Sequence, residues 1–282
     1  MKNIYIATNP QKDVGYSVTS EVCRLISDEG GRIYMSKIHE ASGIDCTYTE
    51  CAPQLSDMII VIGGDGSFID ASTDAISLDI PIIGVNMGRV GYLNEISVDD
   101  LAALKKIFTG EYKIKNKLLL TAEIYTDEGT ETVSRLAVND VVISHSEYLG
   151  ISDFVMYSND GGVRYRADGI VISTPAGSTA YSLSSGGPVV SHSADVMIAT
   201  PIAPHSFFNR SIVFSAGETV KIKNTGSDKL NITVDGRLCA NLPSGGKCKI
   251  GVSDKRMKVM TFKENNMFSN LFGKMQIVED VI

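Results

Sequence analysis

The feature that most constrains the fold is an apolar run that ends in glycines, "DMIIVIGGDGS" at residues 57–67. Its apolar residues follow one another, without the alternation of apolar and polar residues that marks a strand with one solvent-exposed face. Such a run is expected where helices cover both faces of a parallel sheet. The run "IPIIGVN", residues 80–86, has the same character. Each run leads into a glycine-rich turn.

Strand-like and helix-like patterns alternate over the first part of the chain. The runs "KNIYIATN" and "RIYMSK" predict two strands, and the segment between them has helical spacing of apolar residues, at Val14, Val18, Val22 and Leu25. This alternation predicts a doubly wound parallel sheet in an α/β domain, a fold that binds ligands at the carboxyl ends of its strands.

The second half of the chain has a different texture. From about Lys113 to Val252 it consists of short β-rich runs separated by turn signals such as "NDGG" and "PSGG". We therefore expect an α/β domain over 1–98 and a β-rich domain over 99–254, with a helix opening near Ser97. The tail, 255–282, has a β-like start and then an amphipathic pattern with Phe268, Leu271 and Phe272. We expect it to complete the first domain.

Charge and cysteine usage exclude several classes of protein. A formal net charge of −7 argues against binding to a nucleic-acid backbone, so an anionic ligand must be held by local features such as backbone N–H groups, a few cations or a metal ion. No apolar run approaches the ~20 residues that span a bilayer. We therefore expect no membrane partner. The five cysteines form no C-x-x-C pair and are expected to be unbridged thiols, which favours a cytoplasmic protein.

The segment "GGDGS", residues 63–67, permits two interpretations. It can be a turn in which glycines supply positive φ angles, or a loop whose amides contact a phosphate at a helix N-terminus. The spacing alone does not decide between them. The dinucleotide fingerprint G-x-G-x-x-G fails, because Asp70 occupies the third glycine position. Among phosphates, Asp65 would have to hold a metal ion, accept a hydroxyl proton or contact a sugar.

Three further stretches combine polar residues with apolar runs. "NMGRVGYLNE", residues 86–95, reads mainly as a loop that turns into the next element. Asn139 and Asp140 stand at an apolar strand, where either a structural hydrogen-bonded pair or a ligand contact is expected. The stretch 165–190, "YRADGIVISTPAGSTAYSLSSGGPVV", surrounds an apolar strand with small and hydroxyl residues. This composition suits a flat ligand that lies close to the backbone.

In this order, the pieces "GGDGS", "NMGRVGYLNE", "NDVV", "DGIVISTPAGSTAYSLSSGGP", "IAPHSFFNR" and "VDGR" resemble the NAD kinase family. The resemblance implies an α/β domain followed by a β-sandwich, in a homodimer or homotetramer. It implies phosphorylation of the adenosine ribose 2′-hydroxyl of NAD to give NADP. The donor would be ATP, another nucleoside triphosphate or polyphosphate, with a divalent cation such as Mg²⁺. No residue of the chain is assigned as a metal ligand.

The resemblance also implies roles for particular residues. Asp65 would be the general base beside the ribose hydroxyl, and Gly64 and Gly66 would contribute their backbone. The dinucleotide would be bound by Asn139, Asp140, Arg166, Asp168, Thr179, Ala180, Tyr181, Ser184, Ala203 and Arg237.

The chain departs from the family pattern at several positions, among them Tyr92 and Ala176, and two rival functions accompany this hypothesis. Ser67 stands where the family usually has Thr, and Asp70 where members commonly carry a basic residue or His. The second change puts in doubt a cationic contact to the phosphate donor. The rivals are a lipid or sugar kinase that shares "GGDG", and a dinucleotide sensor without catalysis.

Overall fold

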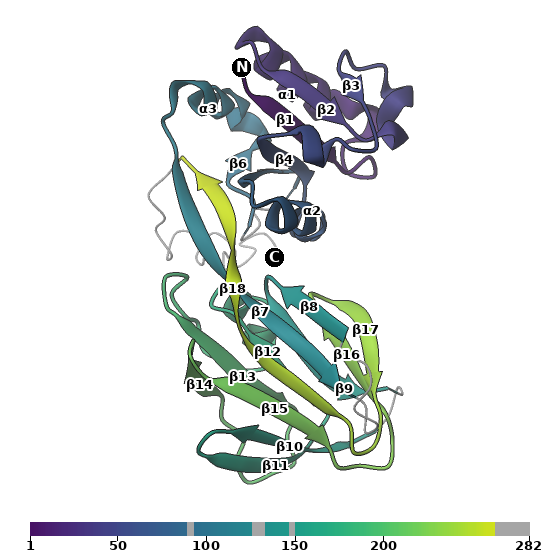
Figure 1. Ribbon diagram of the computed structural model, residues 1–282, viewed down its shortest axis with the longest axis vertical. Coiled ribbons are helices and arrows are strands. Elements are labelled where there is room, and N and C mark those ends of the chain that lie inside the picture. Colours follow the sequence, from purple (N-terminus) through teal and green to yellow (C-terminus); the bar gives the residue numbers. More distant parts are fainter. Residues whose placement is uncertain (89–92, 126–132, 147–149, 263–282) are drawn as a thin grey trace, which may run out of the picture. The chain divides into compact units, whose positions relative to one another are not determined.

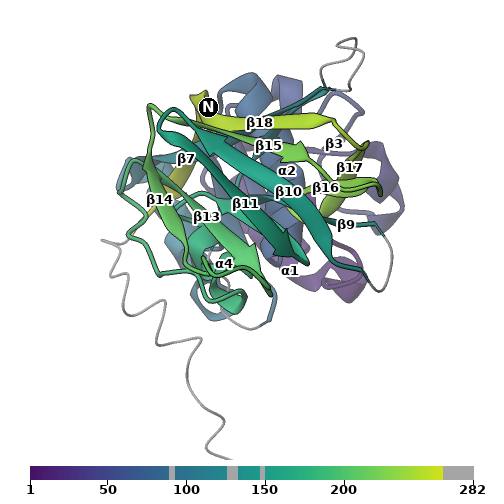
Figure 2. The ribbon, with the colours of Figure 1, turned by 90° about the horizontal axis from the view of Figure 1, so that it is seen from below.

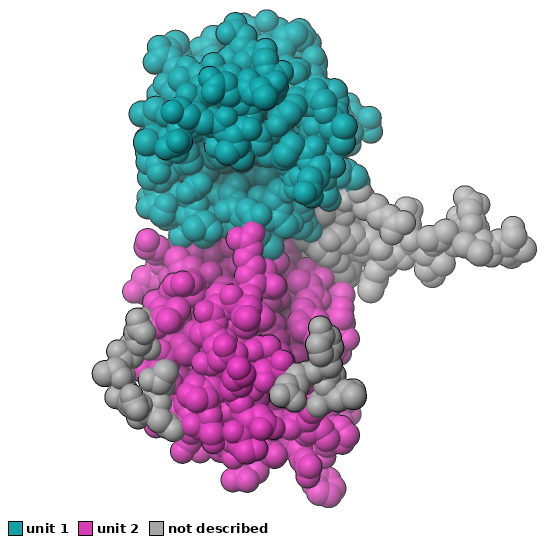
Figure 3. Space-filling view, turned by 90° about the vertical axis from the view of Figure 1, so that its right-hand side faces the viewer, with its two compact units in different colours: residues 1–116, 257–282 teal, residues 117–256 magenta. Residues whose placement is uncertain are grey.

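The computed structural model describes residues 1–88, 93–125, 133–146 and 150–262. The chain forms two compact units, coloured separately in Figure 3. Unit 1 comprises residues 1–116 together with the chain from Met257 onward, and unit 2 comprises Lys117–Arg256. The chain passes from one unit to the other within two long strands, β7 (Lys113–Tyr125) and β18 (Lys247–Thr261).

Unit 1 contains a parallel sheet with the order β18-β5-β4-β1-β2-β3, in which β6 also pairs with β5 (Figure 1). Its own strands are β1 (Asn3–Thr8), β2 (Arg32–Met35), β3 (Thr47–Tyr48), β4 (Met58–Gly63), β5 (Ile82–Asn86) and β6 (Ile96–Ser97). Every residue of β4 and β5 is buried, as their unbroken apolar runs predict. The doubly wound parallel sheet is confirmed.

Helices cover both faces of this sheet. The main ones are α1 (Ser17–Asp28) and α2 (Asp65–Leu78). Ile60 and Ile62 of β4 share a core with Val22 and Ile26 of α1. Because successive side chains of a strand point to opposite faces, the intervening residues face the other side, where α2 packs on β4 and β5.

Unit 2 is a β-sandwich (Figure 2). One sheet has the order β11-β10-β15-β18, extended by β7 and β8, and the other has the order β14-β13-β12-β9-β16-β17. A single apolar cluster takes residues from both, such as Phe154 from the first and Ile172 from the second. The strands new here are β8 (Val133–Ala137), β9 (Asp140–His145), β10 (Ser152–Ser158), β11 (Gly161–Ala167), β12 (Gly169–Ser173), β13 (Val196–Ile202), β14 (Ile212–Ser215), β15 (Thr219–Asn224), β16 (Leu230–Val234) and β17 (Arg237–Leu242).

Short helical segments complete both units. In unit 2, η5 (Gly177–Thr179) and α4 (Tyr181–Ser184) follow β12. In unit 1 there are η1 (Val14–Tyr16), η2 (Lys37–Ser42), η3 (Pro53–Leu55), η4 (Val98–Lys105) and α3 (Lys106–Thr109). No helix in the described ranges is long and apolar enough to cross a membrane.

Three local expectations need correction. The helix after Ser97 begins there as expected, with the Ser97 hydroxyl accepting from the Asp99 N–H, but it is a 3-10 segment that kinks at Asp100 before the single turn of α3. Val14 lies outside α1 and is exposed, so it does not belong to that helix's apolar face. Strands β11, β13 and β17 were not foreseen.

The domain boundary also lies later than residue 98. Leu104 and Ile107 pack in the apolar core of unit 1, which keeps the segment as far as Asn116 with the α/β unit. At the other end, β18 pairs in parallel with β5 through Val259 and Ile82. The amphipathic pattern at Phe268, Leu271 and Phe272 lies outside the described residues.

Candidate active site

The glycine loop of unit 1, residues 63–66, connects β4 to α2. None of its glycines has a positive φ, so the simple turn interpretation is wrong about why glycine stands there. A Cβ on Gly63 would lie 2.6 Å from the Ser67 Oγ, and one on Gly64 would lie 2.7 Å from the Lys12 Nζ. A Cβ on Gly66 would meet nothing within 4 Å. Close packing therefore excludes a side chain at Gly63, whereas at Gly64 only the flexible end of the Lys12 side chain would have to move. Gly66 is exposed and has room for a side chain.

Asp65 is the first residue of α2 and is half-buried. Its Oδ1 accepts hydrogen bonds from the Leu93 N–H at 3.3 Å and from the Asn94 Nδ2 at 3.1 Å. Asn94 is itself buried, and its Oδ1 lies so close to Gly84 that a Cβ there would come within 1.9 Å. The segment after β5 thus holds the carboxylate in one orientation at the N-terminus of a helix.

Described residues of the stretch "NMGRVGYLNE" make structural hydrogen bonds. The Asn86 side chain donates to the Gly88 carbonyl, and Glu95 accepts from the Thr261 hydroxyl at 2.7 Å and the Phe262 N–H at 3.1 Å. Residues 89–92 lie outside the described part of the chain. The contribution of this stretch to the site comes from Asn94, which the sequence reasoning did not single out although it lies within the quoted motif.

In unit 2, Asp140 begins β9 and is buried, and Asn139 precedes it half-buried. Their backbone is held by Asp235, whose carboxylate accepts from the N–H groups of Val138, Asn139 and Asp140 at 2.8, 2.7 and 3.1 Å. Asp235 lies in the two-residue turn between β16 and β17, with a φ of 49°. The sequence reasoning missed Asp235, although it stands in the quoted "VDGR", an Asp-Gly hairpin signal.

A second turn holds the same segment from another direction. The Thr174 hydroxyl donates to the Val138 carbonyl at 2.7 Å, and the Thr174 N–H donates to the Asn139 carbonyl at 2.8 Å. Gly177 lies so close that a Cβ on it would come within 2.0 Å of the Asn139 carbonyl oxygen. Asn139 and Asp140 are therefore presented by a rigid frame.

Burial changes the acidity of both carboxyl groups at this place. Burial, reinforced by the nearby charge of Asp235, raises the pKa of Asp140 to about 7. Burial also raises the pKa of Asp235, but the three backbone N–H donors oppose this rise. Near neutral pH, Asp140 is thus present in two forms: a protonated acid that can donate a hydrogen bond and a carboxylate that can only accept one.

The structure brings Arg166, Asp168 and Ala203 together. The Asp168 N–H donates to the Ile202 carbonyl at 3.0 Å, and the His205 N–H donates to the Arg166 carbonyl at 2.8 Å. Ala203 between them has a φ of 43°, which is unusual for a residue with a side chain. Such backbone strain is concentrated at functional sites and makes this turn a site candidate.

The remaining predicted residues differ in exposure. Thr179 is buried and its hydroxyl donates to the Ala176 carbonyl at 3.1 Å, so its side chain serves the turn. Tyr181 and Ser184 of α4 are exposed, and Ala180 is half-buried between η5 and α4. Arg237 is exposed at the start of β17.

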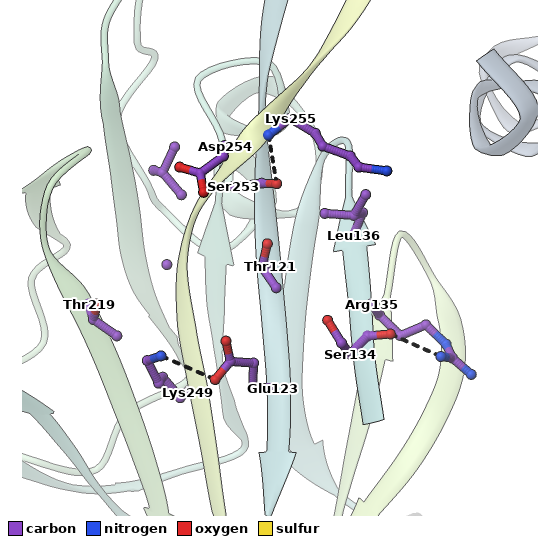
Figure 4. A pocket seen from close by; sticks show the side chains of 12 residues that line it. Thr121, Glu123, Ser134, Arg135, Leu136, Thr219, Lys249, Ser253, Asp254 and Lys255 are labelled. Atoms are coloured by element: carbon purple, nitrogen blue, oxygen red, sulfur yellow. Dashed lines mark hydrogen bonds and ion pairs between the residues drawn. The ribbon is translucent and has the colours of Figure 1, made fainter. Parts of the chain in front are cut away.

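The described residues contain no group of three His, Cys, Asp or Glu side chains that could hold a metal ion. One polar pocket of about 650 Å³ lies on unit 2, between β7, β8, β15 and β18 (Figure 4). It is lined by the ion pair of Glu123 and Lys249, with 3.1 Å between Oε2 and Nζ. None of the predicted site residues lines this pocket, and it is not the candidate active site.

Family models match both halves of the chain. The model described as ATP-NAD kinase N-terminal domain matches residues 4–112, which include Asp65. The model described as ATP-NAD kinase C-terminal domain matches residues 138–262, which include every residue expected to bind the dinucleotide. The chain belongs to the NAD kinase family.

Relatives of similar length support the assignment. An NAD kinase of Lachnoclostridium phytofermentans is 34% identical over 97% of this chain and 99% of its own length. An NAD kinase of Natranaerobius thermophilus is 33% identical over 98% of each chain. Among these enzymes the identity extends over both units.

Solved NAD kinases have the same fold. The yeast NADH kinase complexed with NADH has a TM-score of 0.88 at 19% identity, covering 100% of this chain and 89% of that one. The NAD kinase from Archaeoglobus fulgidus in complex with ATP has a TM-score of 0.73 at 23% identity, covering 97% of each chain. At these identities the likeness concerns the fold, and it agrees with an α/β unit and a β-sandwich.

Proposed function

We propose that this NAD kinase family member transfers a phosphoryl group from a nucleoside triphosphate, with ATP as the expected donor, to the adenosine ribose 2′-hydroxyl of NAD. The product is NADP. The observation that carries the proposal is the glycine loop, where the open backbone of Gly66 adjoins the oriented carboxylate of Asp65 at a helix N-terminus.

The chemistry requires few groups. Asp65 accepts the proton of the ribose hydroxyl, the hydroxyl oxygen attacks the terminal phosphorus, and the bond to the bridging oxygen breaks so that the nucleoside diphosphate leaves. Phosphoryl transfer depends mainly on positioning and charge neutralisation. A divalent cation, with Mg²⁺ as our expectation, neutralises donor charge. The described residues hold no cluster of ligands for it, so we expect it to arrive with the donor's phosphates.

For dinucleotide binding we propose the residues of unit 2. The rigid segment of Asn139 and Asp140 offers an amide and a carboxyl group to ribose hydroxyls. The strained turn at Ala203, with Arg166 and Asp168, is the proposed contact for the nicotinamide half. The run Thr179–Ser184 offers Tyr181 as an exposed ring, and Arg237 offers a cation. We propose a homodimer or homotetramer in the cytoplasm, where its five free cysteines would stay reduced.

The first test is incubation with NAD, Mg²⁺ and one donor at a time, chosen from ATP, other nucleoside triphosphates and polyphosphate. A dehydrogenase specific for NADP reads the product. We expect NADP to form fastest with ATP. Saturable NAD binding without any product would instead favour a sensor, and phosphorylation of a lipid or free sugar with none of NAD would favour the other kinases.

Asp65→Asn tests the proposed base. The amide keeps an oxygen that can accept from Leu93 and Asn94 but does not take up the hydroxyl proton. We expect kcat to fall by ~10²–10⁴-fold, the usual contribution of a general base, with the Kd for NAD changed less than about twofold. Asp28→Asn, at an exposed ion pair on α1, is the matched control and should retain full activity. An unchanged kcat in Asp65→Asn would remove Asp65 from this role.

A further inference from the structure

Lys12 lies on a turn that is fastened to the glycine loop of unit 1. The turn begins at Asn9, whose carbonyl accepts from the Lys12 N–H at 3.0 Å. The Asn9 N–H donates to the Ile62 carbonyl at the end of β4, and the Asn9 Nδ2 donates to the Ser67 Oγ in α2 at 3.0 Å. Asn9 thus forms hydrogen bonds to β4, before the glycine loop, and to α2, after it. These bonds fix the position of the turn that carries Lys12.

The Lys12 ammonium occupies the space that a side chain at position 64 would take. Its Nζ lies 2.7 Å from the site of a Cβ on Gly64. Within the described ranges the ammonium has no hydrogen-bond acceptor and forms no ion pair, even with Asp65. The adjacent Asp13 forms no ion pair with it, and the buried Asp13 carboxylate accepts instead from the Val18 and Thr19 N–H groups at 3.1 and 2.8 Å.

Lys12 is exposed, and its ammonium lies beside the N-terminus of α2, whose first residue is Asp65. The N-terminus of α2 carries a partial positive charge, and its N-cap residue, Gly64, has no side chain that could accept from the first N–H groups. An anion with several charges at this place would be attracted by the ammonium and by the helix N-terminus together.

We propose that Lys12 contacts the terminal phosphates of the phosphoryl donor and is a determinant of donor binding. The inference rests on the proposed function and adds to it the donor-side cation that the sequence left unassigned, since Asp70 stands where a basic residue was expected. Asp70 lies further along α2 and is exposed. Lys12 reaches the loop from the turn after β1, so a motif search centred on "GGDGS" does not find it.

The experiment measures initial rates with the donor varied at saturating NAD, and then with NAD varied at saturating donor. Lys12→Gln removes the charge and Lys12→Arg keeps it. Lys106→Gln, an exposed lysine of α3 in the same unit, is the matched control. Removing a charged hydrogen bond predicts a fall in kcat/KM for the donor of about 10- to 100-fold in Lys12→Gln. The KM for NAD should change less than about twofold, and Lys12→Arg should recover most of the loss.

A binding measurement separates this inference from the function itself. Inorganic tripolyphosphate with Mg²⁺, titrated by calorimetry without NAD, should bind wild type more tightly than Lys12→Gln. If wild type forms NADP but Lys12→Gln keeps its donor KM and its tripolyphosphate affinity, the assignment of Lys12 is overturned. An equal loss for donor and NAD, or a full loss in Lys12→Arg, would also overturn it. A wild type that forms no NADP would contradict the proposed function instead.

Discussion

At the scale of single residues, Asp140 shows how burial changes what a carboxyl group can do. Its pKa rises to about 7 because it is desolvated and lies near Asp235. In the unfolded chain the group titrates near its ordinary value of 3.8. Between these values the folded protein binds a proton that the unfolded chain has lost, so the contribution of Asp140 to stability falls as pH rises through this window.

The pH dependence of unfolding tests this reasoning. Between pH 5 and pH 7.5, wild type should lose on the order of 2 kcal/mol or more of unfolding free energy relative to Asp140→Asn, since one pKa unit corresponds to about 1.4 kcal/mol. The amide cannot ionise and resembles the protonated acid. Urea unfolding of both proteins across this range measures the difference. Parallel curves for the two proteins would show that Asp140 does not titrate here.

Gly66 provides a second test at this scale. Its φ is ordinary and a Cβ would meet nothing within 4 Å, so the fold without ligand does not require glycine. Gly66→Ala should keep or raise stability, by up to about 1 kcal/mol, because Ala is the better helix former. If phosphates lie against this backbone, the same change should lower kcat/KM for the donor by about 10-fold or more. Thermal unfolding measures the change in stability, and initial rates with varied donor measure kcat/KM. Full activity of Gly66→Ala would show that the donor phosphates do not lie against this backbone.

At the scale of elements, the segment before β9 is held by a turn and a hairpin that are distant in sequence. Thr174 and Gly177 follow β12, and Asp235 joins β16 to β17. The sequence allowed Asn139 and Asp140 either a structural role or contact with a ligand. Their backbone is part of a hydrogen-bonded frame, and that frame fixes the side chains proposed to bind NAD.

Gly177→Ala tests that frame. The new methyl would come within 2.0 Å of the Asn139 carbonyl oxygen, so the segment must shift. We expect about 1–3 kcal/mol of destabilisation and a raised KM for NAD, with the donor KM little changed. Gly217→Ala is the control, because a Cβ there meets nothing within 4 Å and its φ is ordinary. Wild-type stability and NAD affinity in Gly177→Ala would contradict the rigid frame.

The strands also show where an apolar sequence pattern predicts secondary structure and where it does not. The unbroken apolar runs of β4 and β5 predict strands covered on both faces, and they are. Strand β11, "GGVRYRA", and strand β17, "RLCANL", bury few of their residues, so their apolar pattern is weak. Their extended form comes from pairing with β10 and β16. Pairing with distant strands leaves little trace in a local pattern.

At the scale of the whole molecule, each unit has its own apolar core and its own share of the proposed chemistry. Unit 1 contains Asp65, the glycine loop and Lys12, and unit 2 contains the proposed dinucleotide-binding residues. Because the net charge is −7, binding of anionic substrates depends on the local arrangement of N–H groups and cations. A protein that repels anions overall binds them where amides and a cation converge.

The fold class, the family and most of the residues proposed to act could be predicted from the sequence, because they depend on apolar periodicity and on motifs that are contiguous in the chain. Tertiary structure decided what holds those residues and what else lies beside them. Asn94 orients Asp65, Asp235 holds the segment of Asn139 and Asp140, and Lys12 lies against Gly64. These contacts join segments far apart in sequence, and their energies depend on distance, burial and charge in three dimensions, which local patterns do not record.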